Sequence, residues 1–260
     1  GYIEGLVSFD PLKYGLLPSS VEGGDFDHFI ALELVNRALL DAGLLDKPFP
    51  RDKTEVILGH GTYINPGNTN WLQHSFVLDQ TIEILRKFNP EYSADTFNKI
   101  RAELKASLPP INSQNIPSLI PNIMAGRIAN RFDFMGGSYI VDGACASSLI
   151  AIECGIKDLL LGKCDLAVVG GVQGYIPPAV FMLFCELGAL SRTSEIRPFS
   201  KDADGTLLGA GAGVIILKRF KDAQEQGDKI YALLKGVGLS SDGKARGLLA
   251  PRAEGGALAI

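Results

Sequence analysis

Residues 138–152 read SYIVDGACASSLIAI, and this stretch predicts a strand, a sharp turn and then a helix. Residues 139–141 form a short apolar strand, and apolar residues return at helical spacing from Leu149 onward. Cys145 therefore falls where the strand ends and the helix begins. A helix start offers unpaired backbone N–H groups and the positive end of the helix dipole, and both favour a thiolate over a thiol. The spacing leaves two interpretations open: an activated nucleophile or a small buried core residue.

The residues on either side of Cys145 are small. Gly143, Ala144 and Ala146 leave room for a substrate carbonyl to approach the sulfur, and the N–H groups of the turn are candidate oxyanion donors. Asp142 is expected to hydrogen-bond the backbone of the turn. Glu153 is expected to be a structural residue of the helix rather than a general base.

The rest of the chain alternates helices and strands. We predict helices from Asp25 or Asp27 to Gly43 and over residues 71–88, 93–107, 122–132, 177–188 and 219–225. We predict strands over residues 54–58, 165–170, 214–217 and 230–237, with loops over 60–70 and 191–213. The continuous apolar run DLAVVG at 165–170 is typical of a parallel strand that is buried on both faces. This alternation predicts an open α/β sheet with helices on both faces.

The composition excludes several classes of protein. A net charge of −4 without a basic block gives no reason to expect a nucleic-acid partner, and no apolar run reaches the ~18 residues of a membrane span. The cysteines form no CxxC pair and have no histidine close by in sequence, so we expect no zinc site. Scattered cysteines fit a reducing compartment, so a cytoplasmic location is expected. The four cysteines are Cys145, Cys154, Cys164 and Cys185.

Three other sets of residues have a structural interpretation and a functional one. The glycine run at 209–213 lacks GxGxxG spacing and precedes a strand, which favours a turn over a phosphate loop. His60 and His74 have no nearby carboxylate in sequence, so a loop or pocket-lining role is favoured over metal binding. Arg127 and Arg131 lie four apart on one helix face. In the favoured interpretation they face solvent or form an internal ion pair, and the alternative is that they meet an acidic partner protein.

Five stretches resemble one family in the same order along the chain. VDGACASSL at 141–149 resembles the active-site signature of β-ketoacyl synthases, the condensing enzymes of fatty-acid and polyketide assembly. FDPLKYG at 9–15, AGRIANRFDFMGGSY at 125–139, CDLAVVGGV at 164–172 and the segment 187–223 resemble the same family. VEGGDFDHFIAL at 21–32 and HGTYINPGNTNWLQH at 60–74 look most like ketosynthases of polyunsaturated-fatty-acid, heterocyst-glycolipid and enediyne synthases.

The resemblance implies a thiolase-like α/β fold with α-β-α-β-α layers, usually as a homodimer in which strand 138–142 pairs with its copy. It implies an acyltransferase in which Cys145 accepts an acyl group from an acyl carrier protein or coenzyme A. A malonyl-type extender on a carrier protein then loses CO₂, and its carbanion attacks the acyl-enzyme to give a 3-oxoacyl thioester. No metal or redox cofactor is required. Phe181, Met182 and Phe184 are expected to shape the acyl pocket.

The chain also departs from the family pattern. The family uses two histidines and a lysine downstream of the cysteine, whereas His28, His60 and His74 all precede Cys145. The family's first strand is also missing. We therefore expect residues 1–260 to be the N-terminal portion of a larger ketosynthase, truncated before the C-terminal half and inactive alone. Two alternatives remain: a thiolase-type or non-condensing ketosynthase that only carries or transfers the acyl group, and a non-catalytic dimerisation scaffold.

Overall fold

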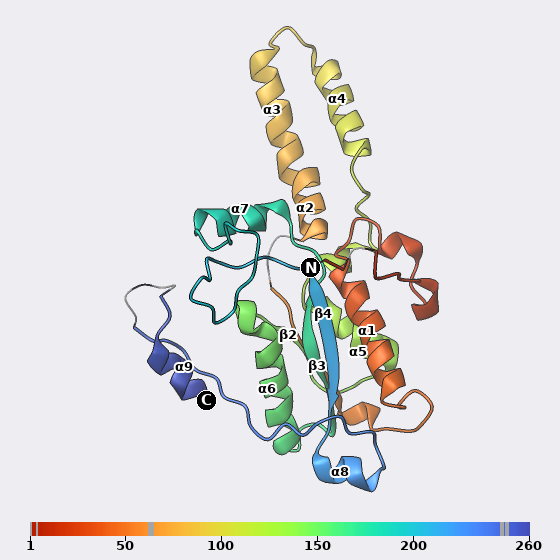
Figure 1. Ribbon diagram of the computed structural model, residues 1–260. Helices are drawn as coiled ribbons and strands as arrows, with labels where there is room; N and C mark the ends of the chain where they lie inside the picture. Colours follow the sequence, from red (N-terminus) through yellow and green to blue (C-terminus); the bar gives the residue numbers. More distant parts are fainter. Residues whose placement is uncertain (1, 4, 62–64, 245–246, 248–249) are drawn as a thin grey trace.

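The computed structural model describes the chain except for residues 1, 4, 62–64, 245–246 and 248–249. Its centre is a four-stranded sheet in the order β2-β1-β3-β4 (Figure 1). The strands β1, β2 and β3 are parallel, and β4 runs antiparallel to β3. The bounds are β1 Thr54–Gly59, β2 Ser138–Val141, β3 Leu166–Gln173 and β4 Gly211–Leu217.

Helices cover both faces of the sheet, as the alternation of elements predicts. The helices α1 (Asp27–Asp41) and α5 (Ile123–Phe132) lie on one face, and α6 (Ser147–Leu160) lies on the other (Figure 1). Successive residues of β1 alternate between the two faces. Val56 and Leu58 pack with α1 and α5, whereas Ile57 packs with α6 and β3. All three side chains are fully buried, so the continuous apolar character of β1 has a direct cause.

The fourth strand differs from the prediction. Residues 214–217 are predicted to be buried, but β4 alternates between exposed and half-buried residues. The physical reason is its position, since β4 is an edge strand with β3 as its neighbour in the described sheet. The predicted strand at 230–237 is wrong: this segment forms no strand in the described part of the chain, and Ile230, Tyr231 and Leu233 are exposed there.

A helical hairpin projects from the body of the molecule (Figure 1). It consists of α2 (Pro66–Leu72), a π-helical turn (Gln73–Val77), α3 (Leu78–Phe88) and α4 (Ala94–Ala106). Ser93 caps α4 through a 3.1 Å hydrogen bond from the backbone N–H of Thr96, and this cap agrees with the predicted start of the helix at residue 93. The predicted loop at 60–70 is wrong from Pro66 onward, and its residues 62–64 lie outside the described residues. Asn65 caps α2 and Pro66 occupies its first position, and this pair is a helix start signal that the loop prediction overlooks.

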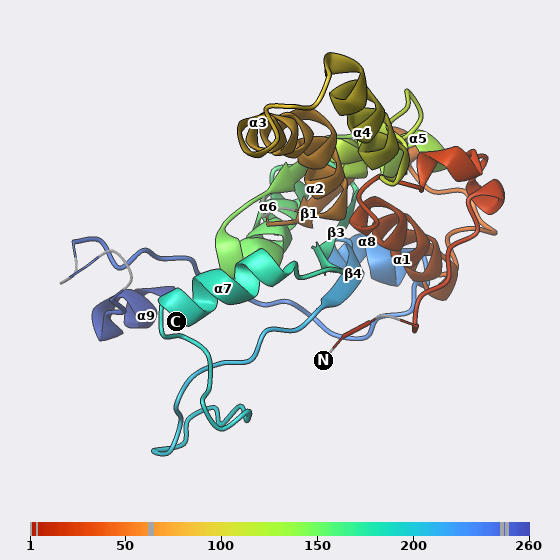
Figure 2. The same ribbon diagram turned by 90° about the horizontal axis from the view of Figure 1, so that it is seen from above.

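The remaining helices are short. They are α7 (Pro178–Glu186), α8 (Phe220–Glu225) and α9 (Ala253–Ala259), and Figure 2 shows them from above. Short 3₁₀ turns lie at Leu12–Tyr14, Pro18–Ser20, Arg51–Lys53 and Ile116–Leu119, and another, Ala144–Ala146, precedes α6. Among the described residues, no helix is both long enough and apolar enough to cross a membrane.

Candidate active site

Cys145 lies at the tip of the turn between β2 and α6. The turn is a short 3₁₀ helix, Ala144–Ala146, and the α-helix begins only at Ser147, slightly later than the sequence suggests. Ala144, the residue before the cysteine, has φ of +51°, a left-handed conformation that costs a non-glycine residue about 1–2 kcal/mol. The side chain of Cys145 is exposed rather than buried in the core. Cys145 therefore lies at the surface, directly after a residue with strained backbone.

Side chains on both sides of the cysteine hold this turn. Asp142 Oδ1 accepts a 2.9 Å hydrogen bond from the backbone N–H of Ala144, which confirms the predicted role of Asp142. Ser147 Oγ accepts a 2.9 Å hydrogen bond from the N–H of Gly143 and donates one of 2.6 Å to the carbonyl of Ala144. Ser147 is not among the residues singled out from the sequence, although a serine at a helix start is a usual hydrogen-bonding partner for such a turn.

Glycines allow α6 to sit directly on the sheet beneath the cysteine. A Cβ at Gly59 would lie 2.4 Å from the carbonyl carbon of Ser147, and one at Gly171 would lie 2.7 Å from Cβ of Ser148. These distances are far shorter than van der Waals contact. The absence of side chains at Gly59 and Gly171 therefore lets α6, and the turn that carries Cys145, lie close to the sheet.

A cavity of about 630 Å³ opens beside Cys145. Residues 208–213 contribute one wall of this cavity. The predicted loop over 191–213 and the predicted turn at 209–213 are wrong from Gly211 onward, because residues 211–213 begin β4 and pair with the end of β3. Phe184 lines the cavity as predicted, but Phe181 and Met182 do not, and Met182 is largely exposed because α7 turns it outward. The other apolar lining side chains are Ile152, Val172, Ile176, Val180 and Ile215.

The three histidines occupy different environments. His60 is buried and belongs to the lining of the Cys145 cavity. His74 is more exposed and donates a 2.8 Å hydrogen bond to the carbonyl of Pro109 at the base of the hairpin. His28 is fully buried, and burial together with the nearby charge of Arg127 lowers its pKa to about 3, so it is a neutral core residue.

A buried polar cluster adjoins the cavity at the start of α1. Nε2 of His60 lies 3.1 Å from Oδ2 of Asp27, and Oδ1 of Asp27 accepts a 2.9 Å hydrogen bond from the N–H of Gly174. Asp25 accepts hydrogen bonds from the N–H of Asp27 (3.0 Å) and from Nδ2 of Asn65 (2.7 Å). These contacts join α1 to the carboxyl ends of β1 and β3 and to the cap of α2.

The donor atoms of Asp25, Asp27 and His60 lie within 4.8 Å of one another, the spacing of a metal site. All four carboxylate oxygens, however, already accept hydrogen bonds. Metal-bound histidines usually donate from their other ring nitrogen, and Nδ1 of His60 has no hydrogen-bond partner within the described residues. We therefore interpret the cluster as a hydrogen-bond network.

The remaining cysteines differ from Cys145 in exposure or environment. Cys164 is buried, and burial together with a hydrogen bond to Glu55 raises its pKa to about 12. Cys154 is half-buried, and burial also raises its pKa. Cys185 is exposed like Cys145 but lies on α7, and the described residues lining the cavity do not include it. All four thiols are free.

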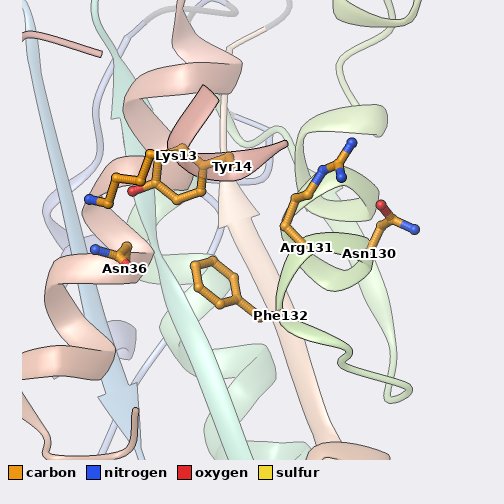
Figure 3. Close-up of a pocket in the computed structure, with 6 residues that line it drawn as sticks. All are labelled: Lys13, Tyr14, Asn36, Asn130, Arg131 and Phe132. Carbon is orange, nitrogen blue, oxygen red and sulfur yellow. The ribbon is translucent and has the colours of Figure 1, made fainter. Parts of the chain in front are cut away.

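The two arginines of α5 do not share one environment. Arg127 is partly buried over the ring of Phe29 and donates to Ser118 Oγ, so it is an internal residue without a carboxylate partner in the described structure. Arg131 is exposed and lines a second, smaller cavity of about 280 Å³ (Figure 3). Lys13 and Asn36 lie on one side of the rings of Tyr14 and Phe132, and Arg131 and Asn130 lie on the other. This cavity shares no lining residue with the cavity at Cys145 among the residues described.

An exposed cysteine on a strand–turn–helix unit of a thiolase-like α/β sheet is the arrangement of a ketosynthase domain. The chain belongs to the β-ketoacyl synthase family, because residues 1–223 match the model described as the N-terminal domain of β-ketoacyl synthase. This result confirms the family resemblance and the predicted fold class.

The chain is similar to parts of large synthases. It is 32% identical over 249 residues to a polyunsaturated fatty acid synthase of Thraustochytrium sp., covering 95% of this chain and 9% of that protein. It is 33% identical over 251 residues to polyketide synthase PksN of Bacillus subtilis, covering 96% of this chain and 4% of that protein. The solved ketosynthase from module 6 of the bacillaene synthase of Bacillus subtilis 168 matches with a TM-score of 0.68 and 29% identity, covering 95% of this chain and 36% of that one.

Proposed function

We propose that this chain supplies the acyl-accepting part of a β-ketoacyl synthase. The thiolate of Cys145 attacks the carbonyl carbon of an acyl thioester on an acyl carrier protein or coenzyme A. A new C–S bond forms, the old C–S bond breaks, and the released thiolate takes up a proton. The observation that carries this proposal is the exposed Cys145 on its strained turn, beside a cavity with apolar walls. Apolar walls suit an acyl chain, and the N–H of Cys145 is the proposed oxyanion donor.

The second step is a decarboxylative condensation. A malonyl-type thioester on a carrier protein loses CO₂, and its carbanion forms a C–C bond to the acyl carbon. The thiolate of Cys145 leaves, and a 3-oxoacyl thioester remains. We propose that the two histidines and the lysine of this step come from another part of the protein, because no histidine follows Cys145 in the chain. Relatives described as polyunsaturated fatty acid and polyketide synthases support this reaction class.

Two further properties belong to this proposal. We infer that β2 pairs with the same strand of a second copy, since β2 is the other edge strand of the described sheet and its residues are only half-buried. Sedimentation of the purified protein as a monomer would contradict this inference. We also infer a cytoplasmic location, because all four cysteines are free thiols.

Thiol labelling tests the nucleophile, and Cys185 provides an internal control because it is also exposed. Iodoacetamide in limiting amount should modify Cys145 before Cys185, and peptide mass spectrometry identifies the site. In a separate sample without iodoacetamide, acyl-coenzyme A or an acylated carrier protein should leave an acyl group on Cys145. The variant Cys145→Ala should lack this acyl group, and Cys185→Ala should retain it. Labelling of Cys185 first, with no acyl group on Cys145, would favour the non-catalytic scaffold instead.

Product analysis separates condensation from simple acyl transfer. With a malonyl carrier protein added, we expect the 260-residue chain to accumulate acyl-Cys145 without forming a 3-oxoacyl thioester. The longer protein that contains the downstream histidines should form that product. Acyl transfer without condensation by the longer protein would support the thiolase-type or non-condensing alternative. Steady 3-oxoacyl formation by residues 1–260 would show that their own side chains suffice.

A further inference from the structure

The backbone N–H groups of the nucleophile turn, residues 142–147, find acceptors within the turn with one exception. Side chains of the turn accept from Gly143 and Ala144, at 2.9 Å each, and its carbonyls accept from Ala146 and Ser147. The exception is Cys145, because no described residue accepts a hydrogen bond from its N–H. An N–H that the fold leaves free beside an exposed thiol is available to a ligand.

The peptide group between Ala144 and Cys145 carries this free N–H at one end and a fixed carbonyl at the other. Oγ of Ser147 donates a 2.6 Å hydrogen bond to the carbonyl of Ala144, and the N–H of Ser147 donates to the same oxygen. A trans peptide group is planar, so its C=O and N–H point in opposite directions. Since the carbonyl points at the first residue of α6, the N–H of Cys145 points away from that helix start. Ser147 thereby sets the direction of the free N–H.

The hydroxyl of Ser147 is itself held in place. The residue is 6% exposed, and Oγ accepts from the N–H of Gly143 while it donates to the carbonyl of Ala144. The backbone of Ser147 also lies against β1, where a Cβ at Gly59 would be 2.4 Å from its carbonyl carbon. The peptide group on the other side of Ala144 is fixed by Asp142. The left-handed conformation of Ala144 is therefore held from both sides.

We propose that Ser147 is a positioning residue for acyl transfer to Cys145, because its hydroxyl holds the peptide group that presents the oxyanion donor. The thiolate adds to the thioester carbonyl carbon, and an electron pair moves onto the carbonyl oxygen. That pair returns when the C–S bond to the leaving thiolate breaks. The hydrogen bond from Ser147 also polarises the amide and so strengthens its N–H as a donor. This inference rests on the acyl transfer proposed above, and Ser147 acts through the peptide group.

Two reactions of the same thiol separate positioning of the N–H from a general loosening of the turn. Iodoacetamide is displaced at a carbon that forms no oxyanion, so alkylation reports on the thiol without the N–H. We expect Ser147→Ala to slow acylation of Cys145 by acyl-coenzyme A about 10–100-fold, less than the ~10²–10³-fold that deletion of an oxyanion donor costs. Its alkylation rate at Cys145 should change little. Ser147→Thr retains the hydroxyl and should restore most of the acylation rate.

The chain offers a matched control. Oγ of Ser107 donates a 2.7 Å hydrogen bond to the carbonyl of Leu104, three residues earlier, as Ser147 does to Ala144. Ser107→Ala should leave both rates at Cys145 unchanged. If Ser147→Ala does not fold, Ser147→Cys serves in the same comparison, because it keeps the size of the side chain and replaces the hydroxyl by a weak donor.

The outcomes distinguish this inference from the reaction on which it rests. Equal acylation rates in wild type and Ser147→Ala would overturn the role of Ser147 and leave the acyl transfer standing. Parallel losses of acylation and alkylation would also overturn it, since they would show a purely structural residue. A wild-type protein that takes no acyl group on Cys145 would overturn the acyl transfer, and this inference with it.

Discussion

The substitution Gly59→Ala tests how the nucleophile turn is placed on the sheet. The added Cβ would lie 2.4 Å from the carbonyl carbon of Ser147, 2.5 Å from the N of Ser148 and 2.6 Å from the carbonyl oxygen of Ser147. These atoms belong to the backbone of α6, so no side-chain rotation can relieve the contacts. The start of α6 must move by about 1 Å to restore ordinary contact distances. Inserting a methyl group into a packed core typically costs 1–3 kcal/mol, and we expect about 3 kcal/mol here because the neighbours are backbone atoms.

Urea unfolding measures this loss of stability, and a second glycine provides the control. Gly126 lies within α5, and a Cβ there would meet nothing within 4 Å. Gly126→Ala should therefore stabilise the protein by about 0.5–1 kcal/mol, because alanine restricts the unfolded chain and favours helix. Acylation of Cys145 should fall by about 10–100-fold in Gly59→Ala, since a displacement of about 1 Å suffices for such a loss. A free energy of unfolding within about 0.5 kcal/mol of wild type in Gly59→Ala would refute this reasoning.

A second glycine of the sheet tests the same contact if Gly59→Ala does not fold. A Cβ at Gly171 would lie 2.7 Å from Cβ of Ser148, while its next neighbours are 3.4 Å away. Gly171→Ala alone should cost about 1–2 kcal/mol. The double variant Gly171→Ala with Ser148→Gly removes the contacted atom and should recover part of that loss. No recovery in the double variant would mean that the contact with α6 is not the cause.

Three further predictions concern buried charge and strained backbone. Asp27→Asn removes the carboxylate partner of a buried imidazole, which should cost about 3–5 kcal/mol in urea unfolding, whereas Asp79→Asn in an exposed ion pair should cost under about 1 kcal/mol. Equal losses would contradict the role of burial. Ala144→Gly should retain stability or gain up to about 1 kcal/mol because Ala144 has a positive φ, while Ala102→Gly, at an exposed position inside α4, should lose about 0.5–1 kcal/mol; the reverse order would exclude strain. Burial raises the pKa of Glu55 to about 7, so its protonated form stabilises the fold fully below about pH 4.5, and this contribution is lost as pH rises through 7. Glu55→Gln should therefore match wild type at pH 5 and exceed it by about 1–3 kcal/mol at pH 8, and parallel stability curves would disprove the shift.

The sequence predicts a helix or strand well when the signals for it lie within or directly beside that element. The strands β1 and β3 follow from continuous apolar runs, and α4 follows from its serine cap and apolar period. The failures depend on information that is not local. Residues 230–237 have strand-like composition but no neighbouring strand to pair with in the described structure, and β4 is half exposed because of its place at the edge. The start of α2 is the exception, because Asn65 and Pro66 are a local signal that the loop prediction overlooks.

The residues of the candidate site fall into the same two groups, those that local sequence predicts and those that depend on distant packing. The position of Cys145 in the turn and the hydrogen bond of Asp142 could be predicted because the strand, the turn and the helix are contiguous in sequence. The pairing of His60 with Asp27 could not, because 33 residues separate them and only the packing of α1 against the end of β1 brings them together. In the sequence, the nearest histidine to His60 is His74, but in the structure these two histidines serve unrelated contacts.

The glycine contacts and the buried cluster constrain the same turn from two directions. Gly59 lets α6 approach the sheet, while the next residue, His60, binds the end of β2 through its backbone and α1 through its side chain. Two consecutive residues, the last of β1 and the one after it, therefore contact both the start of α6 and the end of β2, the two elements that the turn of Cys145 connects. A change at either residue should reach Cys145 through the backbone of residues 141–147, since neither side chain has to touch the sulfur to affect its reactivity. The contrast in alkylation rate between Cys145 and Cys185 is the measurement that isolates this effect, because both thiols are exposed and only one follows that backbone.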